Sequence, residues 1–181
     1  MRYASIRSLD ISNGANIGVA LFVQGCPFHC FNCFNPDTWN FNGGKKWTEE
    51  TKNKFLELID RPYIKRISIL GGEPLAEQNL NDVLSLTEEI RISFPKKSIW
   101  LYTGYDFDLL QDKFNKYKNA PSSLDTNKWI TRWKIVSNVD ILIDGEYIDE
   151  QRDISLKWRG SKNQHIWKNE NGRWSDVTYS L

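Results

Sequence analysis

The sequence predicts a single α/β domain in which mostly parallel strands alternate with helices that lie outside them. Two observations predict this class: short apolar runs alternate with segments of helical periodicity, and a glycine follows each strand-like run. Such alternation favours right-handed βαβ units and a mostly parallel sheet. No internal repeat, low-complexity stretch or long linker divides the 181 residues, so we expect one domain over 1–181.

The first half of the chain contains two buried strands separated by a long loop and a helix. Residues 19–23 form an apolar run that predicts the first strand, and 67–70 form the next one. A loop over about 26–46 follows the first strand. Thr48 is a suitable N-cap for a helix that carries Phe55 and Ile59 on one face.

The second half continues the same alternation, and Pro95 prevents the helix before it from continuing. The expected elements are a helix over about 80–92, a strand over 98–103, a helix from near 106, a loop over 119–127, a helix over about 129–136, and strands over 139–143 and 164–167.

Composition and charge exclude several classes of partner. Lys and Arg number 24 against 23 Asp and Glu, giving a net charge of +1, so no global field favours nucleic acid or an acidic membrane. The apolar run 19–23 is too short to span a bilayer, and the first residues lack the apolar stretch of a secretory signal. We therefore expect a cytoplasmic protein with no membrane or nucleic-acid partner.

The three cysteines are the most informative residues in the chain. Cys26, Cys30 and Cys33 form a C-x3-C-x2-C pattern, and the odd number and tight spacing make a poor disulfide framework. Thiolates bind iron strongly, and three ligands for a [4Fe–4S] cluster would leave one iron open to a substrate or cofactor. The alternative is a structural zinc module completed by His29 or His165.

Further polar groups follow the other predicted strands. Because the carboxyl ends of parallel strands share one edge of a sheet, we expect these groups beside the cysteine loop, about 24–39. Gly71 and Gly72 allow close approach of the backbone, and Glu73 adds an anionic acceptor. The turn 71–74 could thus hold an ammonium group through its carbonyls and the carboxylate. Thr103 and Asp144 end the later strands, where the alternative role is to cap turns or helices.

These motifs resemble the radical S-adenosylmethionine superfamily, and within it the small activating enzymes of anaerobic (class III) ribonucleotide reductase. The resemblance lies in the cysteine loop with its flanks, in Gly71-Gly72-Glu73-Pro74, and in the segments 139–147, 152–156 and 159–164. Many members carry an aromatic residue just before the third cysteine. Here that position is Asn32 and the aromatic Phe34 follows, which leaves only a backbone contact expected from Asn32.

The resemblance implies an incomplete (partial) TIM-like barrel, a [4Fe–4S] cluster and S-adenosylmethionine as cofactors. It implies a reaction in which S-adenosylmethionine is split to a 5′-deoxyadenosyl radical that installs a glycyl radical on the large subunit of the reductase. A flavodoxin or ferredoxin would supply the electron. An activase of another glycyl-radical enzyme, or a small-molecule enzyme of the deazaguanine synthase type, is the alternative within the superfamily. The implied cluster ligands are Cys26, Cys30 and Cys33, and the implied cofactor contacts are Asn32, Cys33, Phe34, Gly71, Gly72, Glu73, Pro74, Thr103 and Asp144.

The polar segment 145–181 and the tryptophans have less specific expectations. Arg152 and Arg159 could grip a carboxylate or a partner protein, although single surface arginines are usually only solvated. Trp39 and Trp47 flank the cysteine loop and could shield the cluster or face a partner. Three later tryptophans are expected to cover the sheet, because aromatic side chains usually act by burying area: Trp158, Trp167 and Trp174.

Overall fold

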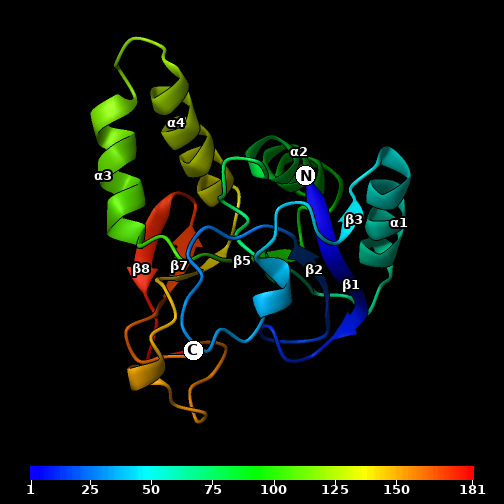
Figure 1. Cartoon of the computed structure of the whole chain (residues 1–181). Coiled ribbons are helices and arrows are strands. Elements are labelled where there is room, and N and C mark those ends of the chain that lie inside the picture. The colour runs from blue at the N-terminus through cyan, green and yellow to red at the C-terminus, as the bar shows by residue number, and fades with distance from the viewer.

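A computed structural model describes all 181 residues, which form one eight-stranded sheet and four α-helices (Figure 1). The strands are β1 (Arg2–Asp10), β2 (Gly18–Val23), β3 (Lys45–Lys46), β4 (Arg66–Gly71), β5 (Ser98–Tyr102), β6 (Ile141–Asp144), β7 (His165–Glu170) and β8 (Arg173–Asp176). The helices are α1 (Glu49–Asp60), α2 (Leu80–Ser93), α3 (Phe107–Tyr117) and α4 (Leu124–Ser137), with short 3-10 turns η1 (Pro36–Thr38) and η2 (Asp149–Gln151).

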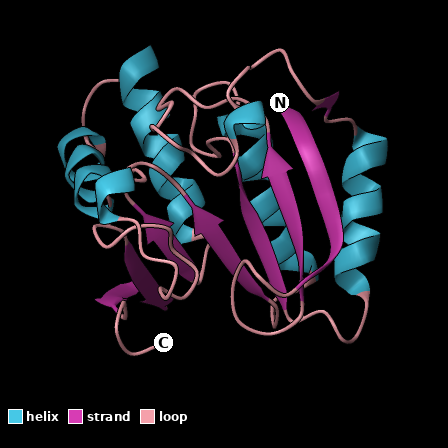
Figure 2. Ribbon diagram, turned by 60° about the horizontal axis from the view of Figure 1, so that its bottom comes forward, coloured by secondary structure: helices cyan, strands magenta, loops and turns pink.

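The sheet has the order β3-β1-β2-β4-β5-β6-β7-β8, and its four central strands, β2, β4, β5 and β6, are parallel. The flanking strands pair antiparallel. Because the parallel strands lie in chain order and right-handed crossovers join them, all four helices fall on one side of the sheet (Figure 2). The edge strands β3 and β8 do not pair, so the barrel is incomplete, and the predicted fold class is confirmed.

Both faces of the central strands are buried, and successive side chains alternate between two different environments. One face packs against the helices in the main hydrophobic core. The other is the concave inner face, and one row of its side chains lies near the C-terminal ends of the parallel strands. This row consists of Phe22, Leu70, Tyr102 and Ile143.

Side-chain caps explain where two of the helices begin. The Thr48 hydroxyl accepts a hydrogen bond from Thr51 N, as the sequence predicts for α1. The Ser123 hydroxyl does the same for Thr126 N and starts α4 at Leu124. The prediction of a loop through residue 127 and a helix only from about 129 is therefore wrong, because the Ser-rich stretch contains the cap of a helix.

Three strands have no counterpart in the sequence prediction. β1 pairs with β2 and β3, and β8 pairs with β7, all antiparallel and all at the margins of the sheet. Their side chains are mostly half-buried or exposed, so the apolar run that identifies a central strand is missing. Trp158, Trp167 and Trp174 do pack on sheet or core residues, as predicted. No helix in the structure has the length and apolar character needed to cross a membrane.

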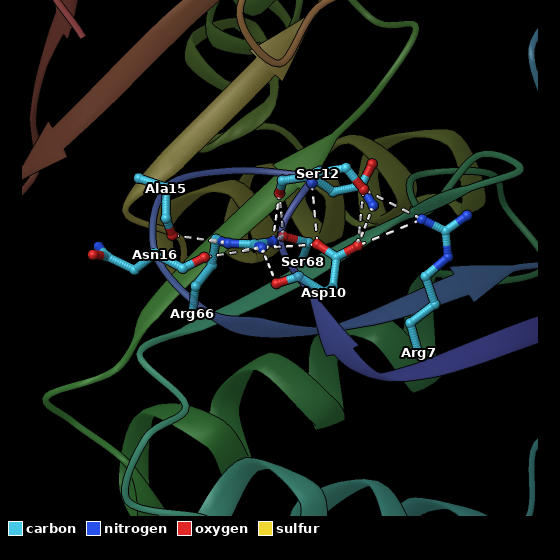
Figure 3. A network of polar contacts seen from close by, with 8 residues as sticks. Arg7, Asp10, Ser12, Ala15, Asn16, Arg66 and Ser68 are labelled. Atoms are coloured by element: carbon cyan, nitrogen blue, oxygen red, sulfur yellow. Dashed lines mark hydrogen bonds and ion pairs between the residues drawn. The ribbon is translucent and has the colours of Figure 1, made fainter.

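A buried ion pair fills the interior of the partial barrel at the N-terminal ends of the parallel strands (Figure 3). The Arg66 side chain is 1% exposed, and its Nη2 donates to the Asp10 carboxylate at 2.8 Å. The same guanidinium donates to the Asp10, Asn13 and Ala15 carbonyls and to the Ser68 hydroxyl. We call residues 10–16 with Arg66 and Ser68 the barrel floor.

The Asp10 carboxylate is fully partnered within the barrel floor. The Asn13 side-chain amide and backbone N–H donate to it at 2.7 and 3.1 Å. Although burial alone would raise its pKa, the hydrogen bonds from Arg66 and Asn13 hold the pKa of Asp10 below its ordinary value. The barrel floor therefore keeps a charged pair in the interior because every charge has a protein partner.

Candidate functional site

The cysteine loop leaves β2 and crosses the open C-terminal end of the barrel. Backbone hydrogen bonds from Gly25 N to Thr38 O and from Cys26 N to Trp39 O close the loop at its base. The buried Gln24 amide adds bonds to the Asp37 and Asn40 carbonyls. Inside this frame all three cysteines are free and half-buried, and all three line one cavity of about 570 Å³.

The arrangement of the thiols fits a cluster better than a single zinc ion. A zinc site needs its ligands within about 2.3 Å of one point. The structure has no group of three His, Cys, Asp or Glu side chains placed to share one ion. A four-iron cubane is held by thiolates spread around a body several ångströms wide, and the three thiols of this loop all line one cavity.

The environment of Cys26 and Cys30 favours their neutral form until a cation binds. Burial raises the pKa of Cys26 to about 11. Burial also raises the pKa of Cys30, and the negative charge of Glu146 adds to this effect. Metal ligation requires thiolates, so loading the site must release protons from these groups.

The turn 71–74 is joined directly to the cysteine loop. Gly72 N donates to Val23 O at 2.9 Å, and Glu73 N donates to Gly25 O at 2.8 Å. A Cβ at Gly72 would lie 2.6 Å from the Gly25 carbonyl oxygen, so only glycine permits this approach. Gly72 lines the cavity, and its carbonyl accepts no hydrogen bond from the protein.

The Glu73 carboxylate is occupied within the protein. It is 1% exposed and accepts hydrogen bonds from Leu75 N, the Thr103 hydroxyl and Gly104 N at 2.7, 2.9 and 2.8 Å. Burial raises its pKa to about 7 in spite of these donors. Glu73 and Thr103 both line the cavity, but their side chains mainly bind the ends of β4 and β5 to each other.

Asp144 lies away from the cavity. Its carboxylate accepts from Phe107 N at 2.7 Å, the Trp167 indole N–H at 3.0 Å and His165 N at 3.0 Å. It caps the first turn of α3 from the neighbouring strand and fastens β7, while burial raises its pKa. Its position thus matches the capping role that the sequence left open, not a contact with a ligand in the cavity.

The remaining predicted residues divide in the same way. Phe34 lines the cavity, 59% exposed, with its ring 5.0 Å from that of Tyr147 and the Arg152 guanidinium 5.6 Å from its centre. Asn32 lies outside it, and its side-chain amide donates to Asp149. Pro74 is buried behind the turn and is also absent from the cavity wall.

Several residues of the cavity wall escaped the sequence prediction. Tyr102 belongs to it, and its buried hydroxyl has no hydrogen-bond partner. The alternation of β5 could have identified Tyr102, since it shares a face with Trp100. Arg7 and Asn13 reach the wall from a strand and loop with no clear sequence signal, and Arg159 reaches it from the C-terminal segment.

Comparisons with known proteins agree with this site. The family described as "4Fe-4S single cluster domain" matches residues 12–167. A protein of Enterobacteria phage T4, an anaerobic ribonucleoside-triphosphate reductase-activating protein, is 34% identical over 177 residues, covering 96% of this chain and 98% of its own length. Proteins of the same name from Escherichia coli K12 and Salmonella typhi are each 36% identical over 168 residues, covering 92% of this chain and 97% of theirs. This chain therefore belongs to the 4Fe-4S single cluster domain family and to the radical S-adenosylmethionine proteins that activate anaerobic ribonucleoside-triphosphate reductase.

Proposed function

We propose that this chain installs a glycyl radical on anaerobic ribonucleoside-triphosphate reductase and that Cys26, Cys30 and Cys33 hold the cluster for this reaction. The observation that carries the proposal is the shared cavity: three free thiols from one short loop line it together with the Gly71–Gly72 turn. A zinc module has no use for a glycine turn hydrogen-bonded to its ligand loop.

The protein's own groups divide the work of holding the cofactor. Cys26, Cys30 and Cys33 would hold a [4Fe–4S] cluster, and with no fourth cysteine in the chain one iron would lack a protein thiolate. The Gly72 carbonyl, which has no hydrogen-bond partner in the protein, would accept from the ammonium group of S-adenosylmethionine. When bound, the cluster supplies one electron that splits S-adenosylmethionine into methionine and a 5′-deoxyadenosyl radical, which takes a hydrogen atom from a glycine of the reductase.

The inner row of the sheet supplies the apolar side of the cavity. Phe22, Leu70 and Ile143 line it beside the cysteine loop and exclude water from the place where a radical would form. No side chain is needed as a general base, because the reaction moves a hydrogen atom. The positions of Glu73 and Asp144 agree with this, since both carboxylates are taken up by structural hydrogen bonds.

The electron donor and the compartment complete the proposal. A flavodoxin or ferredoxin would supply the electron, as in the family that the sequence resembles. Three clustered free thiols suit the reducing cytoplasm, where such groups are not oxidised to disulfides.

Anaerobic electron paramagnetic resonance tests the function. Reconstituted protein reduced with dithionite should give a cluster signal that changes on adding S-adenosylmethionine, and then a glycyl doublet when the reductase is added. Cys30→Ser should lose both signals, while His29→Ala, which removes an alternative zinc ligand, should keep them.

Two results would contradict the proposal. Colourless protein with one zinc per chain would refute the cluster, since a [4Fe–4S] site requires about four irons. Normal cleavage of S-adenosylmethionine with no doublet on the reductase would refute the partner and leave the cluster chemistry standing.

A further inference from the structure

A second hollow lies against the cysteine loop, separate from the cavity described above. It has a volume of about 490 Å³, and its wall contains Cys26, Pro27, His29, Trp39 and Phe41, with Asn40 and Asn42. Cys26 is the one cysteine that lines both spaces. A cluster bound to Cys26 would therefore be approached through this outer hollow without passing through the cofactor cavity.

The outer hollow is lined by aromatic rings. The His29 ring stacks on Trp39 with centroids 4.7 Å apart and planes at 20°. Phe41 belongs to the same wall. Ring faces of this kind offer an apolar surface to a partner.

The chain beside the outer hollow carries uncompensated positive charge. Lys45 and Lys46 form the exposed edge strand β3, a few residues beyond Asn42, and neither makes an ion pair. The nearby Glu49 and Glu50 are already paired with lysines of α1. Between residues 24 and 47 the only acidic side chain is Asp37.

We propose that the outer hollow, with Lys45 and Lys46, is the docking site of a flavodoxin that reduces the cluster. This inference rests on the proposed function, which requires a one-electron donor. The fully reduced flavin anion would give up one electron and the oxidised cluster would accept it, with no bond formed and no proton moved. Electrons then enter on one side of Cys26 while the cofactor and the glycine occupy the other.

The chemistry of the surface favours a flavodoxin over a carrier with a buried iron–sulfur centre. A flavin presents a planar aromatic edge, which can pack against the rings of Trp39, His29 and Phe41. Two unpaired lysines attract an acidic carrier and raise its rate of association at low salt. β3 also lies at the edge of the sheet, where a partner can reach it.

The test compares a protein donor with a small one, using the reconstituted holoprotein. The loss of the cluster's visible absorption is followed by stopped flow with flavodoxin hydroquinone or with dithionite. We expect K45E/K46E to slow reduction by flavodoxin about tenfold at low salt, with the difference shrinking as salt screens it. The rate with dithionite, an anionic reductant, is measured at high salt, where the field of the lysines is screened, and should not change.

Binding gives a readout that needs no electron transfer. In calorimetric titrations with oxidised flavodoxin, K45E/K46E should weaken binding by a similar factor. Trp39→Phe should weaken it less, because a smaller aromatic ring still occupies the position. The matched control is K116E/K118E, which reverses two exposed lysines at the C-terminal end of α3, far along the chain from the cysteine loop. It should bind like wild type.

Unchanged binding in K45E/K46E would overturn the docking site, and so would an equal fall in the control variant. A parallel loss of the dithionite rate would also overturn it, because the lysines would then act on the cluster itself. The proposed function fails separately: dithionite-driven formation of the glycyl radical does not require flavodoxin, so its absence would refute the activase and not the docking site.

Discussion

The two ends of the central parallel strands contrast in how their polar groups are satisfied. At the barrel floor, Arg66 and Asp10 are both about 1% exposed, and every charged group has a partner from the protein. At the opposite end, three thiols form no disulfide and the Gly72 carbonyl accepts no hydrogen bond. The charged pair at the floor holds the fold together, whereas these groups at the open end are available to a ligand.

The largest effect on stability is expected from Arg66→Met. The change leaves the Asp10 carboxylate buried without its cation, which typically lowers the free energy of unfolding by about 3–5 kcal/mol. Urea denaturation of the metal-free protein measures it. Arg7→Met is the control, because Arg7 is half-exposed and approaches Asp10 only at 3.5 Å, so its loss should cost less than about 1 kcal/mol. Equal losses of stability in Arg66→Met and Arg7→Met would contradict the structural role assigned to the buried pair at the barrel floor.

The free energy of unfolding is expected to depend on pH through Glu73. This residue lies at the open end of the barrel, but its carboxylate is fully hydrogen-bonded, like the groups of the barrel floor. Its pKa is raised from 4.5 to about 7, so between these values the folded state holds a proton that the unfolded state releases. The free energy of unfolding should then fall as pH rises through this window, by up to about 1.4 kcal/mol per pH unit. Glu73→Gln mimics the protonated form and should remove this decline. Parallel pH profiles for the two proteins would show that Glu73 is ionised throughout.

The smallest effect on stability is expected from Cys30→Ser in the metal-free protein. The thiol is half-buried, and its polar contacts are Glu146 at 4.0 Å and the Tyr147 backbone, so the free energy of unfolding should change by less than about 1 kcal/mol. The iron content after reconstitution should nevertheless collapse. A large loss of stability without metal would give this end of the barrel the same structural role as the floor.

The central strands and most helices could be predicted from the sequence because their signals are local. The apolar runs that became β2, β4 and β5 are continuous, and glycine ends each of them. β1 could not be predicted in this way, because its residues gain a partner only when β2 lies beside them. The barrel floor could not be predicted for the same reason. Arg66 and Asp10 are distant in sequence, and nothing in the residues around either one indicates that the two form an ion pair.

The site was predictable in its residue types and less so in its side-chain directions. The cysteines and the glycine turn meet at one cavity, as expected from the ends of parallel strands. Asp144 was assigned by position alone. The alternation along β6 places Ile143 on the inner face, so the next side chain points toward the helices, where Asp144 in fact caps α3. Whether Cys26, Cys30 and Cys33 ligate the cluster stays a prediction for the experiments above.

The unpaired edges of the sheet also determine how a substrate can arrive. Strands β3 and β8 leave a gap in the wall of the barrel. Under the proposed function the substrate is a residue of a folded protein, so it must be presented on a loop. An open wall would let such a loop approach the cavity from the side as well as from the mouth.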